Sequence, residues 1–389
     1  MENQVSLNDA VLEDTLPSNE ALTAEAGVPP KKKKRSVNQQ KLQDNLWGWI
    51  FCIPLIVGTV WFVYVALVMA VMLSFTNYNP GDMTIWEVLA DFSNHIASAK
   101  GEWNEELGMV VGGGGADWLY WYKELFTETV TMSTGEVNEM GLYLFNTVFY
   151  MIGIPIGMIL SMFLAVCMSR DIKGGNVFRV LYYVPCVAST ISVVFTFKIM
   201  FNEAGVINSL LGSKIGWLNT GTTWNSLYRP DNPSTSQFMS DPYWCQGILS
   251  KLVIVIMSVW KGLGGTVILY VAGLSGVNAA TKEAAQIDGA NAWKIFWKVT
   301  MPDLYPVIFY NVVTSVIGGL QIYAEPELLM SSSGSGNYLT SGYVALVFKY
   351  GLKAEGATPG AGAAYGLFLG VIILILTLFQ FWLDSRKKD

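Results

Sequence analysis

Three residues in the apolar stretch 304–329 have side chains that could bind a polar solute inside a membrane. Gln321 offers an amide, Glu325 a carboxylate and Tyr323 an aromatic ring, which suit a solute that has hydroxyls and an apolar face. Gln321 and Glu325 are four residues apart, so a regular helix places them on one face. Tyr323 is rotated by about 200° from Gln321 on such a helix. Either Pro326 and the nearby Gly318-Gly319 distort the helix, or only the pair contacts solute; we favour the second and rank Tyr323 below the pair as a candidate for the solute path. Alternatively, Glu325 reaches the outer interface beside Pro326 and Gln321 bonds a neighbouring helix.

Two lysines also lie within apolar stretches of the chain, at positions 198 and 261. A charged side chain at bilayer depth is costly and is usually paired. Lys198 is close enough to one end of its stretch to extend outward to the interface. Lys261 lies in the middle of its stretch and therefore needs a partner, which the sequence does not identify.

The residue types that catalysis or metal binding would need are scarce in this chain. The four cysteines form no Cys-x-x-Cys pair, and His95 is the only histidine. No Gly-rich phosphate loop followed by Lys and Ser or Thr occurs. The sequence therefore predicts a protein that is not an enzyme and that has no metal site or cofactor of its own.

The elements that must position these residues are membrane helices. The chain has 389 residues, of which 52% are hydrophobic and 14% charged, and a mean hydropathy of +0.38. This composition is typical of a polytopic membrane protein. About 20 apolar residues are needed to cross a bilayer as a helix. Six segments meet or approach that length, and they are residues 48–75, 142–168, 177–201, 248–272, 304–329 and 364–383.

The placement of Lys and Arg predicts the orientation of these helices. Basic residues occupy 31–35 before the first span and 386–388 after the last. Between the first two spans only Lys100 and Lys123 are basic, against eleven acidic residues. Because loops rich in Lys and Arg stay in the cytoplasm, we expect both termini inside and the loops 77–140 and 202–247 outside.

The same reasoning divides the chain into four parts. Residues 1–45 are predicted to form a disordered cytoplasmic tail with the basic run, and residues 46–76 the first transmembrane helix. Residues 77–140 form an extracellular loop. Residues 141–385 form a core of five helices, which includes a cytoplasmic loop at 274–302.

An amphipathic segment at 283–302 lies between two apolar spans. Ala284 and Ala285 keep its helix slim, and Gly289 suits a turn between two short helices. Glu283 and Asp288 can reach cationic groups on a partner protein. The alternative is an ordinary interfacial amphipathic helix that has no partner.

The pattern of residues in this segment is specific. The spacing from Glu283-Ala284-Ala285 through Gly289 to Met301-Pro302 resembles the coupling loop of the integral membrane subunits of ABC importers. The version with Ile287-Asp288-Gly289-Ala290 and Phe296 is similar to that of sugar permeases. The resemblance covers roughly residues 45–385. Further matching positions are Asn146-Thr147, Arg179, Tyr182 to Pro185, Phe201, Gly205, Asn208 and Gly273-Leu274. The chain departs from the family at 331–337, which is rich in Ser and Gly, and in its longer first external loop.

This resemblance implies an all-α polytopic membrane protein with six transmembrane helices, the fold of a type-1 ABC importer transmembrane domain. It implies a permease subunit for a sugar or oligosaccharide in a bacterial or archaeal plasma membrane. Its partners would be a second homologous permease, two ATP-binding subunits, an extracellular solute-binding protein and the lipid membrane, with no nucleic acid. ATP would be bound by the partner subunits. In this family, Glu283, Ala284, Ala285, Asp288 and Gly289 would form the ATPase-coupling loop.

Three other functions remain open at this point. The chain could be an ABC permease for another solute, such as glycerol phosphate, on the same scaffold. It could be an ion-coupled secondary transporter that works alone, which leaves the coupling loop unexplained. It could also be a membrane scaffold without transport.

Overall fold

A computed structural model describes residues 37–78, 84–92, 96, 102–104, 109–111, 117–132, 135–169, 175–218, 247–330, 339–353 and 359–386. Most of the predicted disordered tail, including the basic run at 31–35, lies outside these residues. So does the departure from the family pattern at 331–337. The chain divides into two compact units, Met1–Ala66 and Leu67–Asp389.

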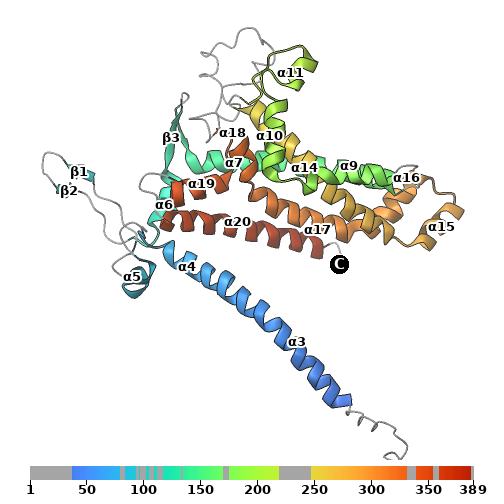
Figure 1. Cartoon of the computed structure of the whole chain (residues 1–389), viewed down its shortest axis with the longest axis horizontal. Helices are drawn as coiled ribbons and strands as arrows, with labels where there is room; N and C mark the ends of the chain where they lie inside the picture. Colours follow the sequence, from blue (N-terminus) through green and yellow to red (C-terminus); the bar gives the residue numbers. More distant parts are fainter. Residues whose placement is uncertain are drawn as a thin grey trace, which may run out of the picture. The chain divides into compact units, whose positions relative to one another are not determined.

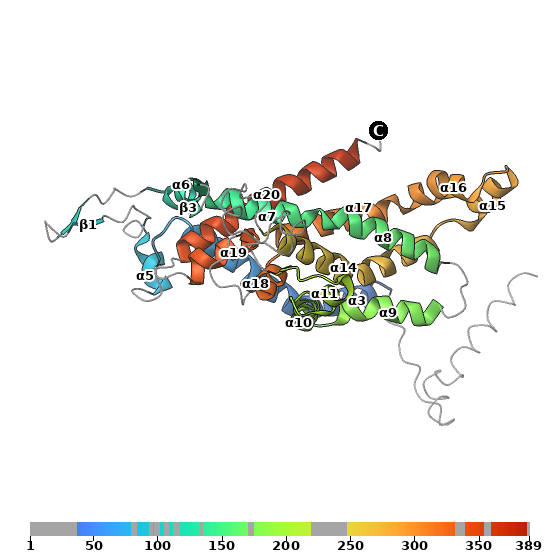
Figure 2. The same ribbon diagram turned by 90° about the horizontal axis from the view of Figure 1, so that it is seen from above.

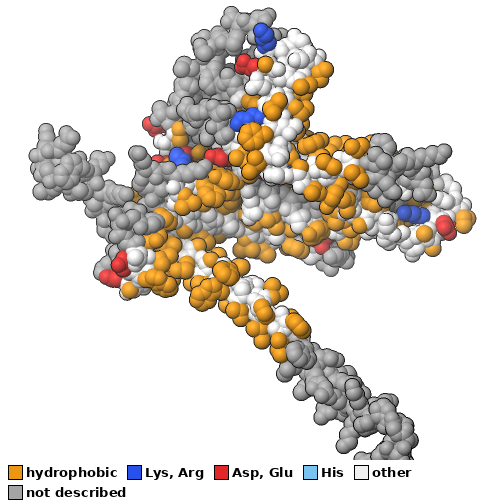
Figure 3. All heavy atoms as spheres, in the orientation of Figure 1, with side chains coloured by type: hydrophobic (Ala, Val, Ile, Leu, Met, Phe, Trp, Pro, Cys, Tyr) orange, Lys and Arg blue, Asp and Glu red, His pale blue; other side chains and the backbone are white. Residues whose placement is uncertain are grey.

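The first unit contains helix α3 (Val37–Thr59) and the π-helical turn η1 (Val60–Val65), and α4 (Ala66–Leu73) begins at its end. The apolar run Gly48–Leu73 is long enough to cross a membrane. Pro54 lies inside α3 without ending it. From Trp49 onward, large hydrophobic side chains of α3, η1 and α4 are exposed, and Figure 3 shows many of them on the visible face, as expected for a helix that meets lipid or another apolar surface.

The second unit is a helical bundle (Figures 1 and 2). Four further helices in it could cross a membrane, which makes five in the described part of the chain. They are Glu139–Met168, Ile248–Ser275, Ala292–Leu320 and Pro359–Ser385. The first is built from α7 (Glu139–Met151) and α8 (Gly153–Met168), the second is α14, and the fourth is α20. The third is built from α16 (Ala292–Ile295), η3 (Phe296–Thr300) and α17 (Met301–Leu320).

The third predicted span differs from the sequence expectation. Residues 177–201 form two helices, α9 (Gly175–Val187) and α10 (Thr190–Met200), which are bent by 105° at the break. Ser189 has an extended backbone (φ −57°, ψ 137°) that separates them. The described part of the chain therefore has six candidate spans only if this bent pair crosses the membrane as one.

The fifth predicted span is shorter than the sequence expectation of 304–329. Helix α17 ends at Leu320, and α18 (Ala324–Met330) starts after a short non-helical stretch. Gly318 and Gly319 occupy the last turn of α17, where glycine lowers helix stability by about 1 kcal/mol per residue. The N–H of Gln321 donates to the Gly318 carbonyl (3.2 Å), which closes the helix with a tighter turn. The assumption that Gln321 and Glu325 share one regular helix is therefore wrong.

Helix α14 is the centre of the bundle and packs against α8, α9 and α17. Figure 2 shows α14 running beside α8 and α9. The approach to α9 requires glycine at position 264, because a Cβ there would lie 2.3 Å from the Tyr182 carbonyl oxygen. A buried apolar cluster where α14 meets α7, α10 and α18 contains Tyr150, Val193, Val194, Phe197, Phe201, Val253, Ile254, Val255, Met257, Leu329 and Met330.

The segment 77–140 contributes α5 (Ile85–Ala90), the strand pair β1 (Glu102–Asn104) and β2 (Met109–Val111), α6 (Tyr120–Thr127), and the hairpin of β3 (Thr129–Met132) and β4 (Gly135–Asn138). Helix α6 packs on the bundle through Trp121, whose Nε1 donates to the Thr76 carbonyl (2.9 Å). Trp121 lies in a second buried cluster with Tyr343 of α19 (Tyr343–Phe348) and Tyr365 of α20. This part of the loop is therefore continuous with the bundle core.

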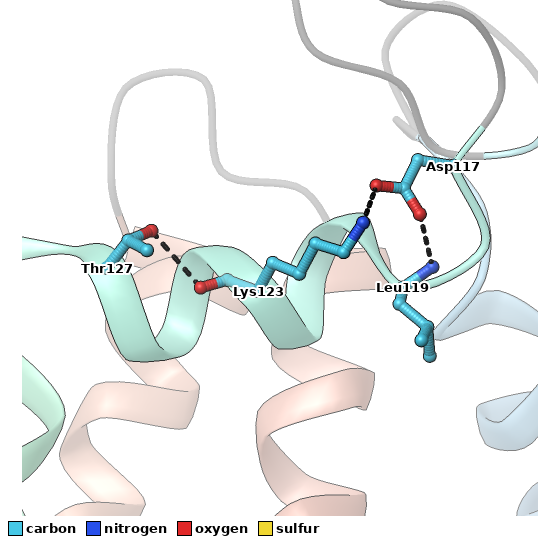
Figure 4. A network of polar contacts seen from close by, with 4 residues as sticks. All are labelled: Asp117, Leu119, Lys123 and Thr127. Carbon is cyan, nitrogen blue, oxygen red and sulfur yellow. Dashed lines mark hydrogen bonds and ion pairs between the residues drawn. The ribbon is translucent and has the colours of Figure 1, made fainter.

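The start of α6 is held by a local polar network (Figure 4). The Asp117 carboxylate accepts from the Leu119 N–H (3.0 Å) and from the Lys123 ammonium (2.6 Å). The Lys123 ammonium is the main cause that holds the pKa of Asp117 below its usual value. Both groups are well exposed to solvent, so the network defines the local geometry of the helix start more than it adds stability.

Candidate functional site

A cavity of about 480 Å³ lies inside the second unit, between α8, α14, α17 and the start of α18. Its wall combines apolar side chains, such as Met158 and Val259, with several that can form hydrogen bonds. Its polar lining residues are Tyr150, Ser161, Ser258, Lys261, Thr266, Ser315, Gln321 and Glu325. A cavity of this size, mostly apolar with a few polar groups, is the usual form of a small-molecule site.

Gln321 and Glu325 both line this cavity. The sequence argument brought them together through helical spacing, which the break after Leu320 rules out. They line the same cavity instead because the non-helical stretch after Leu320 and the first turn of α18 both contribute to its wall. Gly318 and Gly319 are also in the lining. A Cβ at Gly318 would meet nothing within 4 Å, whereas a Cβ at Gly319 would lie 3.0 Å from the Ile154 side chain.

Tyr323 lies elsewhere and is not among the residues that line the cavity. Its ring stacks on Phe348, with ring centroids 4.6 Å apart and planes 25° apart. It packs at the edge of the buried cluster that contains Trp121 and Tyr343. The structure therefore supports ranking Tyr323 below the Gln321 and Glu325 pair.

Lys261 is paired with Glu325, a partner that the sequence did not identify. Its Nζ lies 2.9 Å from the Glu325 Oε1 and donates to the Thr190 Oγ1 at 2.7 Å. The two charged side chains are 24% and 20% exposed. The sequence offered one signal for this pair, which is that two apolar stretches carry opposite charges. A charge inside a membrane usually has a partner. This contact links α14, α18 and the start of α10, where the bent pair begins its second helix.

Lys198 lies outside the cavity. Its Nζ donates to the Leu328 carbonyl of α18 at 3.4 Å, and it lines a separate hollow beside Phe195 and Asn202. It therefore contacts protein and does not simply extend to the interface as the sequence suggested.

The predicted coupling segment is a helix–turn–helix at the end of the bundle opposite α6 and β3 (Figures 1 and 2). Its first helix, α15 (Ala279–Ile287), is capped by Asn278, whose side chain accepts from the Ala280 N–H (2.9 Å). Its second helix, α16, is capped in the same way by Asn291, which accepts from the Lys294 N–H (2.9 Å). Side-chain caps of this kind stabilise short helices by about 1 kcal/mol each.

Gly289 makes the turn between these two helices. Its φ is +76°, a left-handed conformation that side chains with a Cβ resist. Its N–H donates to the Gln286 carbonyl, and the next residue, Ala290, donates to the Ala285 carbonyl, both at 3.0 Å. These two bonds form a Schellman motif, which satisfies the last carbonyls of α15. The sequence prediction of a glycine turn at this position is therefore confirmed.

The surface of this segment is open. Glu283, Ala284, Asp288 and Gly289 are exposed, and Ala285 is half-buried. Beside them, Ile287 is 86% exposed and Trp293 is 70% exposed. Figure 3 shows Lys or Arg and Asp or Glu side chains at this end of the bundle, next to hydrophobic ones. Mixed apolar and charged groups on a rigid turn are suited to contact with another protein.

Three motif residues noted in the sequence form hydrogen bonds with parts of the chain that are not helical. The Asn146 amide donates to the Ser341 carbonyl (3.1 Å), and the Thr147 hydroxyl accepts from the Tyr343 N–H (2.8 Å). These bonds fasten the stretch before α19 onto α7. The Asn208 amide donates to the Glu203 and Ile215 carbonyls and accepts from the Trp217 indole, which orders the turn around α11 (Val206–Leu211).

Comparison with known proteins agrees with this arrangement. The family described as "Binding-protein-dependent transport system inner membrane component" matches residues 153–389. The chain belongs to this family. Among its relatives is the Probable ABC transporter permease protein YesP of Bacillus subtilis, which is 25% identical over 93% of this chain and 98% of its own length.

Other relatives carry sugar names. The Lactose transport system permease protein LacF of Rhizobium radiobacter is 28% identical over 62% of this chain and 75% of its own. The Arabinooligosaccharides transport system permease protein AraP of Bacillus subtilis is 30% identical over 60% and 67%. A chain of a bacterial alginate ABC transporter, solved with an alginate pentasaccharide-bound periplasmic protein, has a TM-score of 0.62 at 18% identity, over 90% and 98% of the two chains. At that identity the likeness establishes the fold, that of an ABC importer permease.

Proposed function

We propose that this chain is a transmembrane permease subunit of an ATP-driven ABC importer for a sugar or oligosaccharide, and that it forms half of the translocation pathway. Membership of the binding-protein-dependent family supports the class of protein. The sugar names of several relatives support the kind of solute. The observation that carries the proposal is the cavity of about 480 Å³, in which Gln321, Glu325 and several hydroxyls face apolar side chains.

The exposed turn between α15 and α16 is the proposed contact with a separate ATPase. Glu283, Ala284, Ala285, Asp288 and Gly289 would form a compact knob that fits a groove of that partner. Two ATP-binding subunits would bind and hydrolyse ATP. The permease itself would then need no cofactor and would catalyse no reaction.

The remaining partners follow from the same role. A second, similar permease would complete the pathway, and an extracellular solute-binding protein would deliver the sugar to segments 77–140 and 202–247. This requires both termini in the cytoplasm and a place in the plasma membrane of a bacterium or archaeon. The apolar surface of the described helices supports a multi-pass membrane protein.

Reconstitution of the importer tests the proposal. The tagged chain is purified from its native membrane with the subunits that stay bound, and it is sealed into liposomes containing ATP. Labelled oligosaccharides and the co-purified or co-encoded binding protein are added outside. We expect uptake that needs both ATP and the binding protein. Uptake driven by an ion gradient without ATP would identify a secondary transporter instead, and no uptake with any oligosaccharide would contradict the assignment to sugars.

A further inference from the structure

We propose that the Lys261–Glu325 pair sets the charge selectivity of the cavity, so that the pathway accepts uncharged sugars and rejects anionic and cationic ones. This inference rests on the proposed role of the chain as a sugar permease. The pair is placed where it can act, because both side chains are in the cavity wall and each is about one-fifth to one-quarter exposed.

The rest of the described cavity wall carries no formal charge. Apart from Lys261 and Glu325, its polar groups are hydroxyls, the Gln321 amide and the Cys186 thiol. With the two charges 2.9 Å apart, the net charge of the wall is zero. If either member of the pair is neutralised, the other becomes the only charge among the described residues of the wall. Such a charge would act strongly, because screening by salt is weak in a partly buried site.

An uncharged sugar can use both members of the pair. A lysine ammonium has three N–H donors, and two of them serve Thr190 and Glu325. The third can donate to a sugar hydroxyl, and the second carboxylate oxygen, Oε2, can accept from a neighbouring hydroxyl. Both hydrogen bonds involve a charged group and are therefore stronger than those between neutral groups.

A charged sugar has no such advantage. A uronate or phosphate close enough to bond Lys261 also lies within a few Å of Glu325, so the repulsion offsets the attraction. An amino sugar that approaches Glu325 is likewise repelled by Lys261, so the attraction is again offset. The pair therefore argues against an anionic solute such as a glycerol phosphate.

Three trisaccharides on one β-1,4 backbone test this directly. They are cellotriose, its form oxidised at C6 to the uronic acid, and the glucosamine trimer; maltotriose and its uronic acid provide a second backbone. Glycerol 3-phosphate is included as a phosphorylated probe. Binding to the purified complex in lipid nanodiscs is measured by saturation-transfer NMR, which detects weak ligands without the binding protein.

The two charge-removing variants should change selectivity in opposite directions. Glu325→Gln leaves Lys261 alone, so binding of the uronic acid should improve on the order of tenfold relative to the neutral sugar. Lys261→Gln leaves Glu325 alone, so the glucosamine trimer should gain by a similar factor. The exchange of both, Lys261→Glu with Glu325→Lys, should restore the neutral preference. Glu327→Gln is the matched control, since Glu327 lies on the same helix but outside the cavity wall.

The outcomes separate this inference from the function on which it rests. A parent complex that binds neutral sugars, with a preference unchanged in Glu325→Gln and Lys261→Gln, would overturn the selectivity role and leave the sugar permease standing. An equal shift in Glu327→Gln would also overturn it. If no trisaccharide binds the parent and no oligosaccharide is taken up, both fail. If one of the two single variants does not assemble, the other single variant and the double exchange still test the selectivity role.

Discussion

At the scale of single residues, the candidate solute site includes a residue that lies outside the helices. Gln321 is exposed in the non-helical stretch after α17, on the cavity wall. Its amide can donate to one sugar hydroxyl and accept from another. Nearby Glu325 is already engaged with Lys261. Gln321 is therefore the polar group in the wall whose removal tests solute contact without breaking an ion pair.

We expect Gln321→Ala to raise the solute concentration for half-maximal uptake by about fivefold to twelvefold, since a lost hydrogen bond in a binding site costs about 1–1.5 kcal/mol. Assembly with the ATPase should be intact. Uptake kinetics in proteoliposomes measure the effect. Thr314→Ala on α17 is the control, because its hydroxyl bonds the Tyr310 carbonyl of its own helix outside the cavity wall. Parent-like kinetics in both Gln321→Ala and Glu325→Ala would show that these residues are structural.

At the scale of elements, glycine decides two local arrangements for different reasons. Gly289 provides a left-handed turn with open space around it, so only its backbone conformation requires glycine. Gly264 has ordinary helical geometry inside α14, and only the nearness of α9 requires it. The first requirement concerns the shape of an exposed knob, and the second concerns packing in the bundle.

Gly289→Val should abolish uptake while the protein still inserts in the membrane. A β-branched residue at this φ costs at least about 1–2 kcal/mol, so the turn between α15 and α16 would change and no longer fit the ATPase. Glu283→Lys should have the same effect by reversing a charge on the knob. ATP-dependent uptake and co-purification of the ATPase are measured. Gly212→Val is the matched control for co-purification of the ATPase, because Gly212 also has a positive φ (+61°) in open space but ends α11, far along the chain from the coupling segment. Equal loss of the ATPase from both valine variants would indicate general misfolding.

Gly264→Ala should lower the melting temperature of the detergent-solubilised protein by several degrees. Alanine improves helix propensity by about 1 kcal/mol, but overpacking against the α9 backbone costs about 1–3 kcal/mol or more. A Cβ 2.3 Å from the Tyr182 carbonyl oxygen makes the second effect larger. Gly370→Ala on α20 should instead raise the melting temperature, because a Cβ there meets nothing within 4 Å. A stabilised Gly264→Ala would mean that α9 and α14 separate easily.

At the scale of the whole molecule, the two functional surfaces are on different elements of the bundle. The cavity involves the middle of α14 and the end of α17, whereas the exposed knob lies between the end of α14 and the start of α17. Both surfaces are therefore joined by the same two helices. A change at the knob has a direct structural route to the cavity, as an importer driven by a separate ATPase requires.

Cysteine labelling should place segments 77–140 and 274–302 on opposite sides of the membrane. The charge pattern predicts the first outside and the second in the cytoplasm. Leu119→Cys and Ile287→Cys are introduced at exposed positions, after removal of the four native cysteines. A membrane-impermeant maleimide should label position 119 in intact cells and position 287 only after permeabilisation. The reverse pattern would invert the predicted topology.

The sequence by itself determined the class of fold, most of the spans and the glycine turn at position 289. Apolar length and local conformational preference depend on neighbouring residues, so they can be read along the chain. The resemblance at 283–302 gave the family, which the comparison over residues 153–389 confirmed.

Only the tertiary structure decided which polar groups meet. The break after Leu320, which Gly318 and Gly319 favour locally, removed the helical argument for Gln321 and Glu325, and the packing of α18 against α10 and α14 still brings both residues to one cavity. The partner of Lys261 lies 64 positions away in the chain. Pairing over that distance leaves no periodic signal in one sequence, because it follows from the packing of α10, α14 and α18 around a shared space.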